Sequence, residues 1–219
     1  ITPIQEAFKG KLDFEQRHPI VRDAIQDYFE NDIQNRWVTD MQNILDLLPE
    51  WNTEGFLKGS MRLNQLGVFG HSVGGGAAGK LALTDERIRA GVNLDGIQWG
   101  TKIDTVFQKP FLYLSADWPT EHEDINSHVY RKKSTDYFYE AKILNTGHPN
   151  FMDIPFMIPV ASLTGCGSID PELGMEITTK LVTAFFDRHL RHKEDVDIEA
   201  LKAEFELLEL KAFKGDSVQ

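Results

Sequence analysis

The serine at position 72 is the residue of this chain with the clearest chemical potential. It stands in Gly70-His-Ser-Val-Gly74, between the apolar run Leu66–Phe69 and the small-residue stretch Ala77–Leu83. A serine hydroxyl is a weak nucleophile unless it is exposed, contacts a base and lies beside donors for the oxyanion that forms. A sharp turn from a strand into a helix provides this exposure, and Gly70 and Gly74 would allow the backbones to approach where a Cβ would collide. The pattern therefore predicts a nucleophile elbow, and a glycine-rich turn without chemistry is the alternative.

The base that would activate this serine has to be found among seven histidines. In folds with this elbow the chain order is serine, acid, histidine, so the two histidines at positions 18 and 71 are excluded. Four others lie in a polar stretch or at the end of an amphipathic run, where a solvated histidine is usual: His122, His128, His189 and His192. His148 follows the β-rich segment Tyr137–Leu144 on a short loop, and open α/β sheets bind their ligands at such carboxyl ends of strands. We expect His148 to be the base.

Two aspartates compete for the role of the acid that orients this histidine. Asp95 ends the predicted strand that starts near residue 90, and Asp117 ends the predicted strand that starts at residue 111. Both would lie at the same edge of the sheet as Ser72, because parallel strands end together. An acid after the later strand is common in this type of fold, which favours Asp117, and the residues alone leave both candidates open.

Four segments of the chain carry motifs of one known family. They are Gly70–Gly75, Arg89–Gly96, Lys109–Leu114 and Gly147–Asp153. Over about residues 62–153, the chain resembles the platelet-activating-factor acetylhydrolase family of the plasma type and its bacterial relatives. In that family the acid follows the strand after the elbow, at a Leu-Asp-Gly or Leu-Asp-Ala step, which corresponds here to Leu94-Asp95-Gly96. The resemblance implies an α/β-hydrolase fold with Ser72 as nucleophile, Asp95 as acid and His148 as base, and Asp117 becomes the alternative acid.

The elements that would position these residues alternate between strand and helix. We predict strands at about 65–70, 89–95, 110–116 and 137–145, helices between them, and a C-terminal helix over about 171–191. This alternation indicates an α/β domain with a mostly parallel sheet. Before residue 60 apolar residues recur at helical spacing from Ile20 to Leu48, and Pro49 is expected to end that helix. We expect one domain over 1–219, with a helical segment 1–60, a catalytic core 61–192 and a charged, solvated helical tail 193–219.

An elbow strand is normally flanked on both sides, and this chain offers strands for one side only. The N-terminal strands of an α/β-hydrolase, and the loop that gives the second oxyanion donor, are missing from the predicted elements. The chain also starts at Ile1 and shows no signal-peptide pattern. We therefore expect that an N-terminal segment or a separate fragment completes the sheet, and that residues 1–219 alone are aggregated or inactive.

Further site residues can be proposed from their positions in the chain. The backbone N–H of Val73, directly after the nucleophile, would be one oxyanion donor. Trp99 and Trp118 lie just past strand ends, and Phe151 begins an apolar run to residue 160, so we expect these three to line the acyl pocket. Packing of that run under the C-terminal helix is the alternative.

Composition excludes several classes of partner. The net charge of −11, with scattered basic residues, argues against nucleic acid, and the chain has no run of 18 apolar residues that would predict a transmembrane segment. We find no motif for a metal ion and none for a cofactor. The single cysteine, Cys166, leaves the compartment undetermined.

The sequence therefore predicts a serine hydrolase that cleaves carboxylic esters through an acyl-enzyme. The resemblance implies short-chain acyl or phospholipid-type esters as substrates. A serine peptidase of the same fold is one alternative, although no propeller repeat is visible, and a non-catalytic hydrolase-like module is another.

Overall fold

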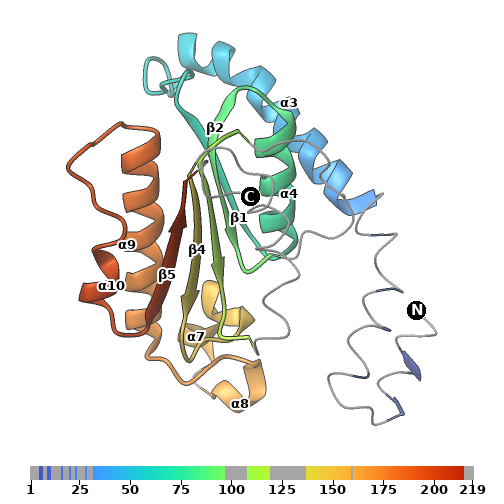
Figure 1. The fold of residues 1–219 in the computed structure, drawn as a ribbon. Coiled ribbons are helices and arrows are strands. Elements are labelled where there is room, and N and C mark those ends of the chain that lie inside the picture. The colour runs from blue at the N-terminus through green and yellow to red at the C-terminus, as the bar shows by residue number, and fades with distance from the viewer. Residues whose placement is uncertain are drawn as a thin grey trace.

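The computed structural model of the chain describes residues 32–96, 108–118, 137–158 and 160–214, together with isolated positions before residue 32. These residues contain a five-stranded sheet in the order β1-β2-β3-β4-β5 (Figure 1). The strands are β1 Leu66–His71, β2 Ile88–Leu94, β3 Phe111–Ser115, β4 Phe138–Ile143 and β5 Leu208–Phe213. β1 to β4 run parallel, and β5 is antiparallel to β4. Each strand therefore pairs with the strand that precedes it in the sequence.

Helices cover both faces of this sheet (Figure 1). The described helices are α3 Gln34–Thr53, α4 Val73–Thr84, α7 Ile154–Met157, α8 Ala161–Thr164, α9 Pro171–His189 and α10 Leu201–Glu204, with the 3₁₀ helix η2 His148–Phe151. On one face, α4 packs its small residues and Leu81 against the sheet and is backed by Val38 of α3. On the other face, Ile177, Leu181 and Phe185 of α9 form the second layer of the core. The sheet is thus buried between two helical layers.

The central strands owe their apolar sequences to this double burial. All of β3 is buried, and so is all of β2 except Arg89. Near-continuous apolar runs are typical of parallel strands that helices cover on both faces. The four predicted strands are confirmed, and so is the C-terminal helix, which the structure places at Pro171–His189.

The helix before the elbow departs from the prediction at its C-terminal end. α3 runs through Pro49 to Thr53, so the expectation that Pro49 ends the helix is wrong. The side-chain amide of Asn52 accepts a hydrogen bond from the Met61 N–H at 3.0 Å and donates one to the Met61 carbonyl at 3.1 Å. This long-range tie stabilises the turn after the proline, where one backbone donor is lost. Most of residues 20–31, which the prediction included in the helix, lie outside the described residues.

The expectation of a solvated helical tail over 193–219 is wrong for its described part. Residues 201–204 form α10, and residues 208–213 form β5, which lies along β4. Leu208 and Leu210 are buried while Glu209 and Lys211 are exposed, which is the alternation of a half-buried strand. The core of the domain therefore extends past residue 192, because this strand covers the outer edge of β4.

The elbow strand β1 is hydrogen-bonded to β2 alone among the strands of the described residues. Described residues between 32 and 60 form α3 and a turn. The expectation that a further polypeptide segment pairs with the free edge of β1 stays a prediction. In the part of the chain that the structure describes, no helix combines the length and apolar character needed to span a membrane.

Candidate active site

Ser72 lies at the tip of a tight turn between β1 and α4. Its backbone angles, φ 58° and ψ −127°, are ones that non-glycine residues adopt only at a cost in free energy. The Ser72 N–H donates to the Leu94 carbonyl at 3.0 Å, and the N–H groups of Gly75 and Gly76 donate to the Ser72 carbonyl at 2.9 and 3.1 Å. This strand, turn and helix provide the context that the nucleophile-elbow motif requires.

Two glycines allow the turn to close. A Cβ on Gly70 would overlap the backbone of Gly74, and a Cβ on Gly75 would overlap the side-chain amide of Asn93. A Cβ on Gly74 itself would lie 3.4 Å from the ring of Trp37, which is an ordinary contact distance. The expectation that Gly74 avoids a collision is therefore wrong, because α4 turns this position toward α3 and away from β1.

Asp95 follows β2 in the left-handed region of backbone space, with φ 50°. The buried side chain of Asn93 holds this turn, since it accepts from the Gly96 N–H at 2.7 Å and donates to the Gly96 carbonyl at 2.9 Å. The Asp95 N–H donates to the Leu114 carbonyl of β3 at 2.6 Å. These bonds fix the direction of the Asp95 carboxylate, whose side chain is only 1% exposed.

His148 begins η2 on the loop that follows β4. The side-chain oxygen of Asn150 accepts hydrogen bonds from the N–H groups of Gly147 and Gly167, at 2.7 and 2.8 Å. A Cβ on Gly147 would overlap the Gly165 carbonyl, so the two segments are in close contact. The loop is thereby anchored to the segment that precedes α9.

The structure brings these three side chains into one hydrogen-bonded line. His148 Nε2 lies 3.0 Å from Ser72 Oγ, and His148 Nδ1 lies 2.6 Å from Asp95 Oδ2. An ionised carboxylate can only accept, so we assign the proton to Nδ1, which leaves Nε2 free to accept the serine proton. An arrangement of this kind can activate a serine hydroxyl and stabilise the imidazolium that forms.

Asp117, the alternative acid, has other partners. One of its carboxylate oxygens accepts a hydrogen bond from the Asn145 N–H at 2.8 Å, and the other lies 4.0 Å from Lys142 Nζ. Asp117 therefore ties the end of β3 to the turn after β4. It is Asp95 that contacts His148.

Trp118 makes a contact that the sequence reasoning missed. Its indole N–H donates to Asp95 Oδ1 at 2.8 Å, and the backbone N–H of Ala116 donates to the same oxygen at 2.8 Å. The signal for this contact is that Trp118 and Asp95 follow neighbouring strands, whose carboxyl ends meet at one edge of the sheet.

The other predicted site residues have less specific surroundings. Phe151 ends η2, packs in part against the core cluster around α9, and has its ring centroid 6.0 Å from that of His71. Val73 is the first residue of α4, where helix N–H groups have no intrahelical partner. Trp99 lies outside the described residues.

His71, next to the serine, packs against the candidate base. Its ring centroid lies 4.5 Å from that of His148. Burial lowers the pKa of His71 and His148 lowers it further, whereas Asp95 acts in the opposite direction. Its Nε2 is buried and has no hydrogen-bond partner among the described residues. His71 is therefore neutral near pH 7 and adds no second positive charge beside His148.

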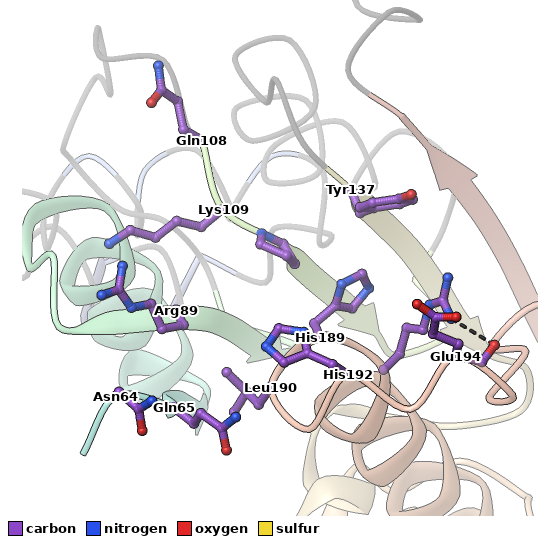
Figure 2. Close-up of a pocket in the computed structure, with 12 residues that line it drawn as sticks. Asn64, Gln65, Arg89, Gln108, Lys109, Tyr137, His189, Leu190, His192 and Glu194 are labelled. Carbon is purple, nitrogen blue, oxygen red and sulfur yellow. Dashed lines mark hydrogen bonds between the residues drawn. The ribbon is translucent and has the colours of Figure 1, made fainter. Parts of the chain in front are cut away.

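A cavity of about 650 Å³ lies at the end of the sheet opposite to Ser72. Figure 2 shows the side chains that line it. It is lined by residues that precede β3 and β4 and by the end of α9, including Lys109, Tyr137 and His189. The Lys109 ammonium is already engaged, because it donates to the carbonyls of Ala82 and Asp85 at 2.7 Å each. Ser72 and its partners follow the carboxyl ends of the strands, so this cavity is separate from them. No described part of the chain groups three or more His, Cys, Asp or Glu side chains as a metal site would.

Comparison with known proteins assigns the chain to a family. A family model described as "Platelet-activating factor acetylhydrolase, isoform II" matches residues 31–206. The chain belongs to this family. The resemblance predicted from the four motif segments is thus confirmed.

The similar proteins carry related names. The platelet-activating factor acetylhydrolase of Cavia porcellus is 25% identical over 169 residues, which cover 72% of this chain and 36% of that protein. A probable 1-alkyl-2-acetylglycerophosphocholine esterase of Arthroderma benhamiae is 29% identical over 157 residues, which cover 58% of this chain and 39% of that protein. The chain thus spans little more than a third of the length of these curated relatives.

A solved structure supports the fold assignment. The ferulic acid esterase of Streptomyces cinnamoneus superposes with a TM-score of 0.64 at 27% identity, covering 75% of this chain and 51% of that one. Together with the mostly parallel sheet and its two helical layers, this likeness confirms the predicted α/β-hydrolase fold.

Proposed function

We propose that the protein containing residues 1–219 is a serine hydrolase of carboxylic esters. The observation that carries this proposal is the hydrogen-bonded line from Ser72 Oγ through His148 to Asp95, with lengths of 3.0 and 2.6 Å. The family, and relatives named as acetylhydrolases or esterases, support the same class of reaction.

The reaction follows from the protonation states in this line. Ser72 Oγ attacks the ester carbonyl carbon while His148 Nε2 takes its proton, and Asp95 stabilises the imidazolium through Nδ1. When the tetrahedral intermediate collapses, His148 gives that proton to the leaving alkoxide, which departs as the alcohol. A water molecule then attacks the acyl-enzyme with His148 as base again, and the carboxylic acid and free Ser72 are regenerated.

The oxyanion of the tetrahedral intermediate needs donors beside the serine. We assign one of them to the backbone N–H of Val73, at the first position of α4, where no intrahelical acceptor competes for it. We propose that its partner comes from a segment outside the described residues. Loss of one such donor typically lowers turnover by about 10²–10³-fold.

The surface after the candidate base supports an apolar substrate. The segment from η2 to α8 exposes several large apolar side chains: Met152, Phe156, Met157, Ile158, Val160 and Leu163. With Phe151 at the end of η2, such a rim favours acyl or alkyl groups over charged ones. We propose short-chain acyl or phospholipid-type esters, in line with the acetyl ester in the name of the Arthroderma relative.

Replacement of Ser72 tests the proposed function. Ser72→Ala removes the nucleophile, so hydrolysis of p-nitrophenyl acetate and butyrate should fall by at least about 10³-fold while the protein stays folded. A fluorophosphonate probe should modify Ser72 in the wild-type protein, and Ser168→Ala, in an exposed loop, is the matched control. Turnover near wild type in Ser72→Ala, or an adduct on another serine, would refute the proposal. Cleavage of peptide amides that is lost in Ser72→Ala would support the peptidase alternative.

A further inference from the structure

We propose that Trp118 is a positioning residue for this reaction and that it acts through Asp95. The proposal rests on the proposed function, since it assigns Trp118 a task within the same site. It adds a second task to the sequence-based expectation that Trp118 lines the acyl pocket, which stays a prediction.

The two carboxylate oxygens of Asp95 have separate tasks. Oδ2 faces His148 Nδ1 at 2.6 Å, whereas Oδ1 accepts the Ala116 N–H and the Trp118 indole N–H at 2.8 Å each. The side chain is 1% exposed, so water cannot readily replace a lost donor. Of the two donors on Oδ1, only the indole N–H can be removed by substitution, because the other belongs to the backbone.

Trp118 is held so that its indole N–H meets the carboxylate. The backbone N–H of Trp118 donates to the Ala116 carbonyl at 2.9 Å, and this hydrogen bond tightens the turn after β3. Its carbonyl accepts from Lys142 Nζ of β4 at 3.4 Å. Trp118 is thus tied to both β3 and β4. Its indole N–H is held in a fixed position beside Asp95, the acid that follows β2.

This hydrogen bond has two effects on His148. It limits rotation of the Asp95 carboxylate, so Oδ2 stays opposite Nδ1 and the ring stays aimed at Ser72 Oγ. It also draws negative charge toward Oδ1, because a hydrogen bond to an ionised oxygen stabilises charge there. Without the indole N–H, more of the negative charge would lie on Oδ2 and act on the Nδ1 proton that faces it.

Trp118→Phe tests the hydrogen bond while keeping an aromatic ring. We expect kcat for p-nitrophenyl butyrate to fall about ten-fold, as for loss of one hydrogen bond to a charged group, with KM changed less than about two-fold. Trp51→Phe, in α3, is the matched control and should alter none of these quantities.

A second pair of variants keeps the test valid if Trp118→Phe folds poorly. The side chains of Gln and Met are of similar length, but only Gln carries an N–H donor. The Trp118→Gln variant should therefore retain several-fold more turnover than the Trp118→Met variant. In an Asp95→Asn background, Trp118→Phe should have little further effect, because the two residues act as one unit. A rise in KM with unchanged kcat, equal turnover of the Gln and Met variants, or additive losses with Asp95→Asn would each overturn the proposal.

A signal independent of turnover separates this proposal from the proposed function. The proton on His148 Nδ1 should give a downfield ¹H NMR resonance, because it lies in a short hydrogen bond to Asp95. Trp118→Phe should shift that resonance and Trp51→Phe should not. An unshifted resonance would refute the role of Trp118 even in an active esterase, whereas full activity of Ser72→Ala would refute the proposed function alone.

Discussion

At the scale of single residues, Asp95 and Asp117 differ in what surrounds their carboxylates. Asp95 is buried against His148 and accepts two further hydrogen bonds, whereas the Asp117 side chain is 35% exposed and bonds to the backbone of Asn145. Only Asp95 can hold the histidine tautomer that leaves Nε2 unprotonated.

We therefore expect unequal effects when each acid is converted to its amide. Asp95→Asn should lower kcat by about 10³–10⁴-fold, because the amide stabilises the wrong tautomer, whereas Asp117→Asn should lower it by less than about ten-fold. Steady-state kinetics on p-nitrophenyl butyrate, with circular dichroism to verify folding, measure both. The reverse order of the two losses would assign the acid to the later strand.

Residue identities close to the elbow were predictable, and side-chain directions were not. Ser72 follows from a local motif, and His148 from chain order and its place after a strand. The direction of Asp95 depends on its left-handed backbone and on the Asn93 side chain, which bonds across three residues. No periodicity in the sequence indicates such a side-chain hydrogen bond. The residues alone therefore could not decide between Asp95 and Asp117 as the acid, and they gave no indication of the hydrogen bond from the Trp118 indole.

At the scale of elements, the junction of β1 and α4 sets how Ser72 is exposed. The helix starts so close to the strand that Gly70 has no space for a Cβ beside the backbone of Gly74. Gly74 faces the ring of Trp37 on α3, where a methyl group reaches ordinary contact distance. The two glycines of the motif are thus not equivalent.

This difference predicts opposite results for two alanine substitutions. Gly70→Ala should lower kcat by at least about 10²-fold or prevent folding, because the added Cβ can be accommodated only by moving the elbow backbone. Gly74→Ala should keep kcat within about three-fold of wild type and leave the melting temperature nearly unchanged. Differential scanning fluorimetry and ester hydrolysis give both values. Equal damage from the two changes would contradict this difference between the two glycines.

Elements with a strong internal pattern were predicted, and those that depend on distant partners were not. The apolar runs of β2 and β3 predict strands without further information, because both faces of each strand are buried. β5 carries Glu209 and Lys211 on its exposed face, and its strand character becomes clear only beside β4. The last turn of α3 likewise depends on Met61, beyond the reach of a local rule about proline.

At the scale of the whole molecule, two partly buried histidines, His71 and His189, lie at opposite ends of the sheet. Burial, with smaller contributions from Arg188 and His192, lowers the pKa of His189 to about 4. Its Nε2 lies 3.0 Å from the Tyr139 hydroxyl, and its ring packs against Phe185. The unfolded chain would bind a proton at this residue near its ordinary pKa of about 6.5.

The sign of the resulting pH dependence follows from proton binding. Between about pH 6.5 and pH 4 the unfolded state binds a proton at His189 that the folded state does not. The free energy of unfolding therefore falls as the pH falls through this window. Above the window, the stabilising contribution of neutral His189 is complete. We expect His189 to contribute about 1–3 kcal/mol of this loss, with His71 acting in the same direction.

Urea unfolding between about pH 7.5 and pH 4.5 measures this contribution. His189→Gln keeps a polar partner for Tyr139 but cannot titrate, so its unfolding free energy should fall less steeply with pH than that of the wild type. His192→Gln, at an exposed position, removes only a small contribution to the pKa of His189, so its curve should stay close to that of the wild type. Parallel curves for His189→Gln and the wild-type protein would exclude His189 as a source of acid sensitivity.

The order of the strands also matters while the protein is being made on the ribosome. Each described strand after β1 pairs with its predecessor, so none of these five strands has to insert between two that are already paired. β1 and β2, which lead into Ser72 and Asp95, can pair before the segment with His148 has left the exit tunnel. β5 covers the outer edge of β4 only later. Nascent chains in which β4 has left the exit tunnel and β5 has not therefore carry an unpaired β4 edge, and these are the species that chaperones should have to protect from aggregation.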